Sequence, residues 1–340
     1  MSDFEQAFKD VTGSPPPDVE NPRLRELWNH PVSELATLHG PPLEEGAKER
    51  HRIYSLMLMA ILHEYFNGLK NGRAGEYPFN EAKDLGRHGD GDYLGHNIAG
   101  IAVNGKGEVI DFDFNHNKLF NSSAEHAEVR LVRRVFALAQ LADSWRTVQP
   151  GVPPPREVPL STSTTLEDVT VYTTLESCAQ CSGTMALGNV REVVYLQTDP
   201  GTYWVGRVLR NLTNDQAPLP ISGGEIGLEY FATLDAGFND FRQKVGPDHP
   251  FWRDGTRSDA SKAVTSYLCT KHARDTYGAA RAEFEALAED PTKLADRRYK
   301  PSTPKGATAA DVLDNAAAVA EAKGFLDYAI ASGRRGTPHR

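Results

Sequence analysis

Four residues in the middle of the chain could build a zinc centre that activates water. His126, Cys178 and Cys181 offer one imidazole and two thiolates, and Glu128 lies two residues after the histidine. Three protein ligands leave a fourth position for water, which is the arrangement of a catalytic zinc site. A carboxylate that is not a ligand can take the proton from that water and pass it to a departing group. The spacing therefore predicts a hydrolytic site with Zn²⁺ as the cofactor and Glu128 as the catalytic residue.

Two structural explanations compete with this prediction. The histidine and the two cysteines could form a structural zinc site, but such a site usually takes a fourth protein ligand, and the remaining cysteine, Cys269, is distant. Glu128 could be an acid that a helix N-terminus favours through its dipole. We expect the catalytic arrangement because one histidine, one carboxylate and two thiols occur in two separate motifs that complete a single hydrolytic site.

The composition indicates a globular protein in a reducing compartment. The chain has 340 residues, of which 39% are apolar, enough for a sizeable core. We find no apolar run near the roughly 20 residues that span a bilayer, and residues 1–10 are polar and acidic rather than signal-like. Three cysteines do not make a disulfide framework, and reducing conditions would keep Cys178 and Cys181 as thiols. We therefore expect a cytoplasmic protein with no membrane partner.

The charge balance favours a small substrate. Lys and Arg number 37 and Asp and Glu number 46, a net charge of −9. Affinity for nucleic acid depends on clustered basic residues that neutralise phosphates. The expected partner is a small molecule, and a polynucleotide is the disfavoured alternative.

Apolar periodicity predicts alternating helices and strands. Helical spacing covers residues 48–67, 126–143, 178–189, 203–212 and 225–245. Strand-like runs cover residues 97–103, 109–114, 169–175, 192–196 and 219–222, with a hairpin turn at 104–107. This order predicts an α/β fold, a three-layer α/β/α sandwich around a mixed five-stranded sheet.

The motifs divide the chain into three parts. Residues 1–45 are rich in proline and form an N-terminal arm with at most short helices. Residues 46–246 contain the zinc domain, and residues 247–340 form a C-terminal extension that is helical at 260–287 and 309–331. We expect the zinc ligands to lie at the starts of the helices from 126 and 178, where backbone N–H groups favour thiolate.

On these motifs the chain resembles the cytidine-deaminase superfamily, and within it the branch of the tRNA adenosine, guanine and cytosine deaminases. The likeness covers about 200 residues, from Lys48 to Val245, and is strongest from Tyr172 to Cys181. His-x-Glu followed by Cys-x-x-Cys is the signature of the nucleobase deaminases. The final strand and helix resemble the closing unit of the branch in which the fifth strand runs parallel to the fourth.

Three departures from the family pattern lie close to the motifs. Ser177 stands where the family usually has a proline before the first cysteine, and Asp111-Phe112-Asp113 replaces the usual Gly-x-Gly. His126 and Cys178 are 178 − 126 = 52 positions apart, about twenty more than usual, because of a Pro-rich loop.

The resemblance implies a zinc-dependent hydrolase that converts an amino group on a nucleobase-like heterocycle to a carbonyl with release of ammonia. It implies substrate contacts from Asn115, Ala127 and Asn97 and a homo-oligomeric assembly. The free base, nucleoside, nucleotide or a related metabolite is the favoured substrate class. An RNA or single-stranded DNA editing enzyme and a non-catalytic zinc protein of the same fold are the alternatives.

Overall fold

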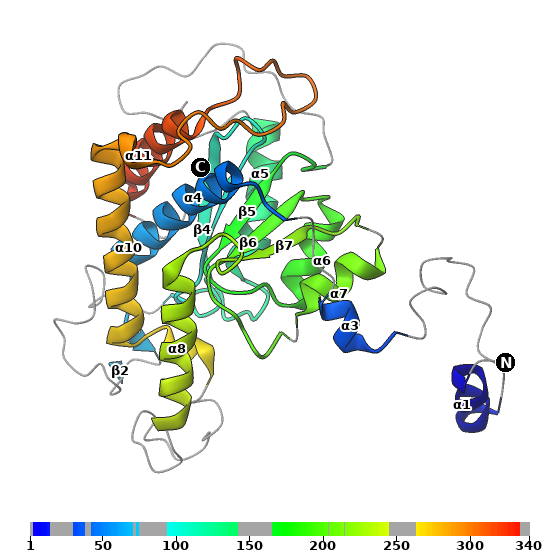
Figure 1. Ribbon diagram of the computed structural model, residues 1–340. Helices are drawn as coiled ribbons and strands as arrows, with labels where there is room; N and C mark the ends of the chain where they lie inside the picture. Colours follow the sequence, from blue (N-terminus) through cyan, green and yellow to red (C-terminus); the bar gives the residue numbers. More distant parts are fainter. Residues whose placement is uncertain are drawn as a thin grey trace.

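The computed structural model describes nine stretches of the chain: residues 3–13, 30–37, 42–70, 73–74, 94–141, 165–202, 204–213, 215–244 and 263–333. A five-stranded sheet in the order β4-β3-β5-β6-β7 lies at its centre (Figure 1). Its strands are β3 (Ala99–Val103), β4 (Val109–Phe114), β5 (Thr170–Thr173), β6 (Glu192–Tyr195) and β7 (Leu219–Ser222). The predicted mixed α/β sheet is confirmed.

The directions of the strands place four strand ends at one edge of the sheet. β3 pairs antiparallel with both β4 and β5, whereas β5, β6 and β7 pair in parallel. β4, β5, β6 and β7 therefore point the same way, and only β3 opposes them. In open α/β sheets, ligands bind outside the carboxyl ends of the strands. We call this edge, where residues following β4, β5 and β6 meet, the carboxyl edge.

The hairpin between β3 and β4 depends on a glycine. Asn104 accepts a hydrogen bond from the Gly107 N–H at 2.9 Å and donates its own N–H to the Glu108 carbonyl at 2.9 Å. Gly107 has φ +91°, and a Cβ there would approach the Arg50 guanidinium to 2.0 Å. Only glycine adopts this turn without strain, as the predicted turn at 104–107 requires.

Three helices cover one face of the sheet. They are α5 (Ala127–Leu141), α6 (Ala179–Leu187) and α7 (Val205–Leu212). Apolar side chains of α5 and α6 form a buried cluster with Val171 of β5 and Val193 of β6. This layer carries the predicted zinc ligands.

The opposite face is covered by a helix that is buried all around. α4 (Glu45–Glu64) exposes almost none of its apolar side chains from Ile53 to Leu62. Burying one Ile, Leu or Met stabilises the fold by about 1.5–3 kcal/mol, so this single helix contributes much of the core. α8 (Glu229–Lys244) packs against the helices 264–267 and 271–289 and adds Leu234, Phe238 and Phe241 to the same apolar cluster.

The C-terminal extension forms an outer layer over α4. Its elements are α9 (Val264–Tyr267), α10 (Lys271–Glu289), a 3₁₀ turn (Pro291–Lys293) and α11 (Asn315–Ser332). α10 and α11 both lie against α4 (Figure 1), and Tyr277, Phe284 and Phe325 belong to the same core as α4. The extension thus shares the core of the zinc domain.

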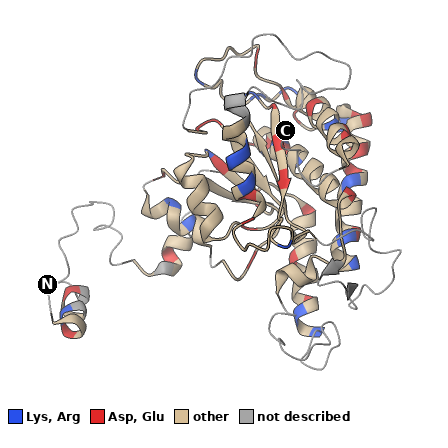
Figure 2. Ribbon diagram, turned by 180° about the vertical axis from the view of Figure 1, so that it is seen from behind, with Lys and Arg blue, Asp and Glu red and all other residues tan. Residues whose placement is uncertain are grey.

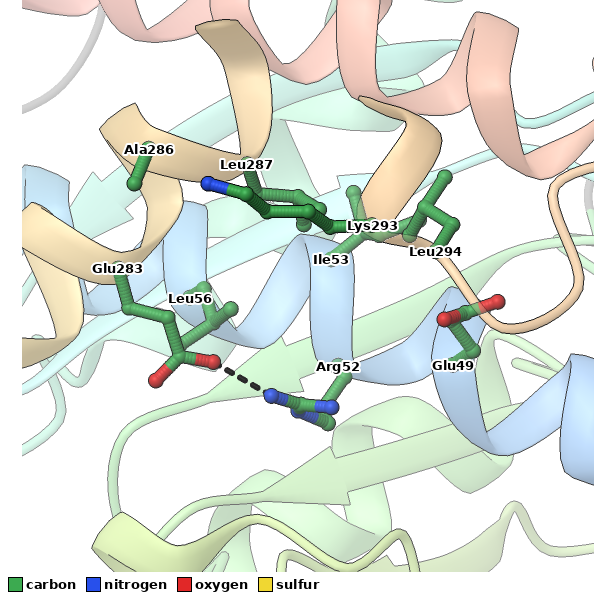
Figure 3. A pocket seen from close by; sticks show the side chains of 9 residues that line it. All are labelled: Glu49, Arg52, Ile53, Leu56, Glu283, Ala286, Leu287, Lys293 and Leu294. Atoms are coloured by element: carbon green, nitrogen blue, oxygen red, sulfur yellow. Dashed lines mark hydrogen bonds and ion pairs between the residues drawn. The ribbon is translucent and has the colours of Figure 1, made fainter. Parts of the chain in front are cut away.

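A hollow of about 220 Å³ remains between α4 and α10. Ile53, Leu56, Leu287 and Leu294 are among the apolar side chains that line it (Figure 3). On its rim, Arg52 donates to Glu283, while the Glu49 carboxylate accepts the N–H groups of Ala295 and Asp296 at 2.6 and 2.7 Å. The polar groups named here pair with protein atoms.

The N-terminal arm contains two described helices, α1 (Asp3–Thr12) and α3 (Val32–Thr37). α3 packs on α7, where Asn211 Nδ2 donates to the Leu35 carbonyl at 2.5 Å. Two short strands, β1 (Leu69–Lys70) and β2 (Arg73–Ala74), form a separate hairpin. Helices long and apolar enough to cross a membrane are absent from the described residues.

Most predicted elements differ from the observed ones by a few residues. The strand at 219–222 is the same in both, and the helix predicted at 48–67 is shifted to Glu45–Glu64 because it ends before Tyr65. The helix predicted at 225–245 begins later, at Glu229, because residues 223–228 form turns. Most of the loops expected at 70–95 and 144–167 and the start of the helix expected at 260–287 lie outside the described residues.

Candidate zinc centre

His126, Cys178 and Cys181 come together above the carboxyl edge. His126 immediately precedes α5, Cys178 is the N-cap of α6, and Cys181 lies in the first turn of that helix. His126 Nδ1 is 3.4 Å from Cys178 Sγ and 3.5 Å from Cys181 Sγ, and the two sulfurs are 3.5 Å apart. The β5-to-α6 turn and the start of α5 thus bring His126 and Cys178, which are 52 positions apart in the sequence, into contact.

These distances fit a tetrahedral zinc ion. Zinc bonds of about 2.0–2.3 Å place neighbouring ligand atoms about 3.3–3.8 Å apart in a tetrahedron. All three ligand atoms lie within 4.8 Å of one another. One imidazole with two thiolates is also a ligand set that zinc binds in catalytic sites. The residues therefore fit Zn²⁺.

The hydrogen bond between the two thiols shifts their pKa values in opposite directions. The hydrogen bond from Cys181 lowers the pKa of the Cys178 thiol to about 4, and it raises the pKa of Cys181. The bond with Cys178 also raises the pKa of His126. Thiolate is the form of cysteine that binds zinc, so the lowered pKa favours the ligand form of Cys178, whereas Cys181 and His126 must release a proton to bind the metal.

The Glu128 carboxylate is buried beside the three ligands, with 3% of the residue exposed. Burial raises its pKa. Its Oε1 accepts hydrogen bonds from Thr173 Oγ1 at 3.1 Å and Ser177 Oγ at 3.2 Å, and its Oε2 is 3.4 Å from Cys181 Sγ. A carboxylate with a raised pKa, held next to the metal ligands, is suited to move protons at neutral pH.

The spacing of the motifs does not predict that Ser177 and Thr173 contact Glu128. Ser177 was recognised only as a replacement for proline, and Thr173 only as a strand residue. Both hydroxyls orient Glu128. A hydroxyl directly before the first cysteine, in place of a residue that cannot donate, was the available signal.

Asn115 lies at the end of β4, where it links two parts of the site. Its Oδ1 accepts the N–H of Ala127 at 2.6 Å, which fixes the start of α5 between His126 and Glu128. Its Nδ2 is buried and has no hydrogen-bond partner within the described residues. The amide is therefore oriented by one atom while the other remains able to donate to a bound molecule.

Asn97, also expected to contact substrate, is fully buried and has its amide engaged elsewhere. Its Nδ2 donates to the carbonyls of Asn67 at 2.7 Å and Leu268 at 3.0 Å, and its Oδ1 accepts the Asn67 N–H at 3.2 Å. These bonds tie β3 to the segment after α4 and to α9. The geometry favours a structural role for Asn97.

The two aspartates that replace the usual glycines form buried ion pairs with α5. Arg134 Nε lies 2.7 Å from Asp111 Oδ2, and Arg130 Nε lies 3.1 Å from Asp113 Oδ1. Burial raises the pKa of Asp113 to about 6. The pairs join the edge strand β4 to the helix that begins beside His126.

A comparison with protein families finds a match to part of the chain. Residues 74–197 match the family model for the cytidine and deoxycytidylate deaminase zinc-binding region. The chain contains a cytidine-deaminase-like zinc-binding region. The match includes all three ligands, Glu128 and Asn115, and it stops at Gln197. A search of curated proteins found no match.

Solved structures of deaminases are similar to part of the chain. One, from a study of A-to-I editing by tRNA:A34 deaminases, is 24% identical over 37% of this chain and 82% of its own, with a TM-score of 0.27. Guanine deaminase from Bacillus subtilis is 20% identical over 33% of this chain and 57% of its own, with a TM-score of 0.24. Guanine deaminase from Nitrosomonas europaea is 16% identical over 39% and 71%, with a TM-score of 0.26. Similarities this low say nothing about the substrate of this chain.

Proposed function

We propose that this protein is a zinc-dependent hydrolytic deaminase of a nucleobase-like heterocycle. In the proposed reaction, water and an amino-substituted ring give the ring carbonyl and ammonia. The observation that carries the proposal is the position of the Glu128 carboxylate, which contacts Cys181 and is held by two hydroxyls beside three zinc-compatible ligands. A structural zinc site has no need of a buried, oriented carboxylate at this position.

The residues of the chain divide the chemistry among them. When bound by His126, Cys178 and Cys181, zinc supplies a water whose pKa is lowered to about 7. Glu128 accepts a proton from that water and returns protons to the departing nitrogen, so that ammonia leaves as a neutral molecule. Asn115 Nδ2 donates to the ring and holds the amino-bearing carbon near Glu128.

A small substrate is favoured over a polynucleotide. The net charge is −9, and acidic and basic residues are interspersed along the described helices (Figure 2). A polynucleotide site needs a continuous basic groove. We therefore place a free base, nucleoside, nucleotide or related metabolite first, and an RNA or single-stranded DNA substrate is the alternative outcome of the experiment below.

Three further expectations accompany the proposal. The thiolate ligands favour a reducing, cytoplasmic location. The family resemblance supports a homo-oligomer. The division into an arm (1–45), a deaminase domain (46–246) and a helical extension (247–340) stays a prediction, with the qualification that α10 and α11 share the core of α4.

The decisive experiment measures ammonia release from zinc-loaded protein with cytosine, adenine, guanine and pterin compounds as bases, nucleosides and nucleotides. Release from one class by the native chain, abolished in Glu128→Ala with one zinc still bound, would establish the reaction. Turnover retained in Glu128→Ala would refute the assignment. Silence across the panel, followed by activity on RNA or single-stranded DNA, would select the polynucleotide alternative, and silence on those too would leave the non-catalytic zinc protein.

A further inference from the structure

Gln197 is a buried amide whose polar atoms lack hydrogen bonds. It lies just beyond β6 and is fully buried. Neither Oε1 nor Nε2 has a hydrogen-bond partner in the part of the chain that the structure describes. A glutamine amide offers two donors and two acceptor sites, and the described residues use none of them.

The backbone places Gln197 beside the turn that carries the first cysteine ligand. The carbonyl of Gln197 accepts the N–H of Glu176 at 2.8 Å, and the N–H of Asp199 donates to Glu176 Oε2 at 3.2 Å. Glu176 directly precedes Ser177, whose hydroxyl holds Glu128. Gln197 is thus attached to the segment that builds the catalytic centre.

Asn115 and Gln197 stand at the same edge of the sheet. Asn115 follows β4 and Gln197 follows β6 after one intervening residue, and these two strands point the same way. Three strand spacings of about 4.8 Å separate them, a gap of roughly 14 Å. A flat heterocycle spans such a separation with a hydrogen bond at each end. The intervening strands are β3 and β5: α5, which carries Glu128, packs on both, and Cys178 follows β5.

A ligand that forms hydrogen bonds with a buried, unpaired amide would remove an energetic cost. Burying a polar group without a partner costs about 1–3 kcal/mol, and such groups in native proteins mark sites where a partner is missing. The two unpartnered side-chain amides named here both lie at the carboxyl edge. Asn97, by contrast, is equally buried and fully paired. These two unpaired amides can therefore offer hydrogen bonds to a molecule bound at this edge.

We propose that Gln197 is a specificity-determining residue whose side-chain amide recognises a lactam edge on the substrate, that is, a ring N–H next to a ring carbonyl. This inference rests on the proposed function, because it concerns the same site. A primary amide presents a carbonyl acceptor next to an N–H donor, and a lactam presents the complementary pair, so two parallel hydrogen bonds form. The favoured substrates are amino-heterocycles that carry an oxo group, and adenine, which has none, is the contrasting compound.

The test compares pairs of compounds that differ only in the lactam: 2-amino-4-oxopyrimidine with 2-aminopyrimidine, and guanine with 2-aminopurine. Binding is measured by equilibrium dialysis to zinc-loaded Glu128→Gln protein, with and without Gln197→Met. Methionine keeps the volume and removes both polar atoms, and replacing an unpaired buried amide by an apolar group leaves stability unchanged or raises it. Gln216→Met, at an exposed position, is the matched control.

We expect Gln197→Met to weaken binding of the lactam compound by about 5- to 150-fold. Binding of the paired compound that lacks the lactam should not change. Equal effects on both members of a pair would overturn the proposal, as would the absence of lactam binding to protein that carries native Gln197. Ammonia release by the protein with native Glu128 is measured in parallel. Lactam binding that depends on Gln197, without ammonia release, would refute the deaminase function alone. Ammonia release together with an unaltered lactam preference in Gln197→Met would refute only the role of Gln197.

Discussion

The carboxyl edge and the α4–α10 hollow differ in how their polar groups are paired. In the hollow, the charged side chains of Arg52, Glu283 and Glu49 pair with protein atoms (Figure 3). At the carboxyl edge, the amides of Asn115 and Gln197 have unused hydrogen-bonding atoms. The difference teaches that an empty volume alone does not identify a functional site, and that the unpaired amides at the carboxyl edge are the groups to test. The hollow is a packing defect between α4 and α10.

Removal of a zinc ligand should have the largest effect. We expect Cys178→Ala to lose zinc and to lower turnover to the background of the assay, since the metal supplies the activated water. Metal content and ammonia release measured on the same sample check this. Cys269→Ala is the control, because Cys269 is buried beside Asn97 and does not belong to the cluster of zinc ligands. This variant should keep both its zinc and its ammonia release. Full activity in zinc-free Cys178→Ala would remove the carboxyl edge from consideration as a metal site.

Loss of the Asn115 amide should come next. Asn115→Asp keeps an oxygen for the Ala127 N–H but removes the Nδ2 donor, and we expect kcat/KM to fall by about 10- to 100-fold. Steady-state kinetics measure this change, with zinc content as the control. If Asn115→Asp and the native chain had equal kcat/KM, the unpaired Nδ2 would have no function.

The hydroxyls that hold Glu128 should give a smaller effect. Ser177→Ala removes one hydrogen bond to a carboxylate, and we expect kcat to fall by about 10-fold with KM little changed, since the bond orients a proton carrier. Thr173→Val, which removes the second hydroxyl at nearly constant volume, should act similarly. A change confined to KM in both variants would indicate that the hydroxyls serve binding instead.

The hollow should give the smallest effect. Arg52→Met combined with Glu283→Gln removes a partly exposed ion pair, and we expect the free energy of unfolding to change by less than about 1 kcal/mol. Urea unfolding measures this, and kcat/KM should stay at the native value. A loss of activity comparable to that of Asn115→Asp would erase the distinction between the two regions.

The sequence predicts those parts of the site that depend on local chemistry. His126, Cys178 and Cys181 could be identified because metal ligands need fixed residue types at fixed spacings, and the structure brings them together. β7 could be located because its apolar run is bounded by turns. Each of these patterns lies within a few consecutive residues of the sequence, although the two ligand motifs are 52 positions apart.

The remainder depends on contacts between distant segments. Asn97 lies just before the first strand, where the family resemblance implies a substrate contact. Its amide nitrogen instead donates to the carbonyls of Asn67 and Leu268. Gln197 belongs to no recognisable motif, and only its burial without partners distinguishes it. The covering of α4 by α10 and α11 likewise follows from tertiary packing, which periodicity along one helix does not specify.

The complete enclosure of α4 has a consequence for how the chain can be shortened. A protein ending at Gly246 would keep every zinc ligand, yet it would present to water the apolar strip of α4 that α10 and α11 now cover. Contiguous apolar surface of this kind promotes aggregation. α10 and α11, although they carry none of the zinc ligands, therefore protect the zinc-binding region from aggregation.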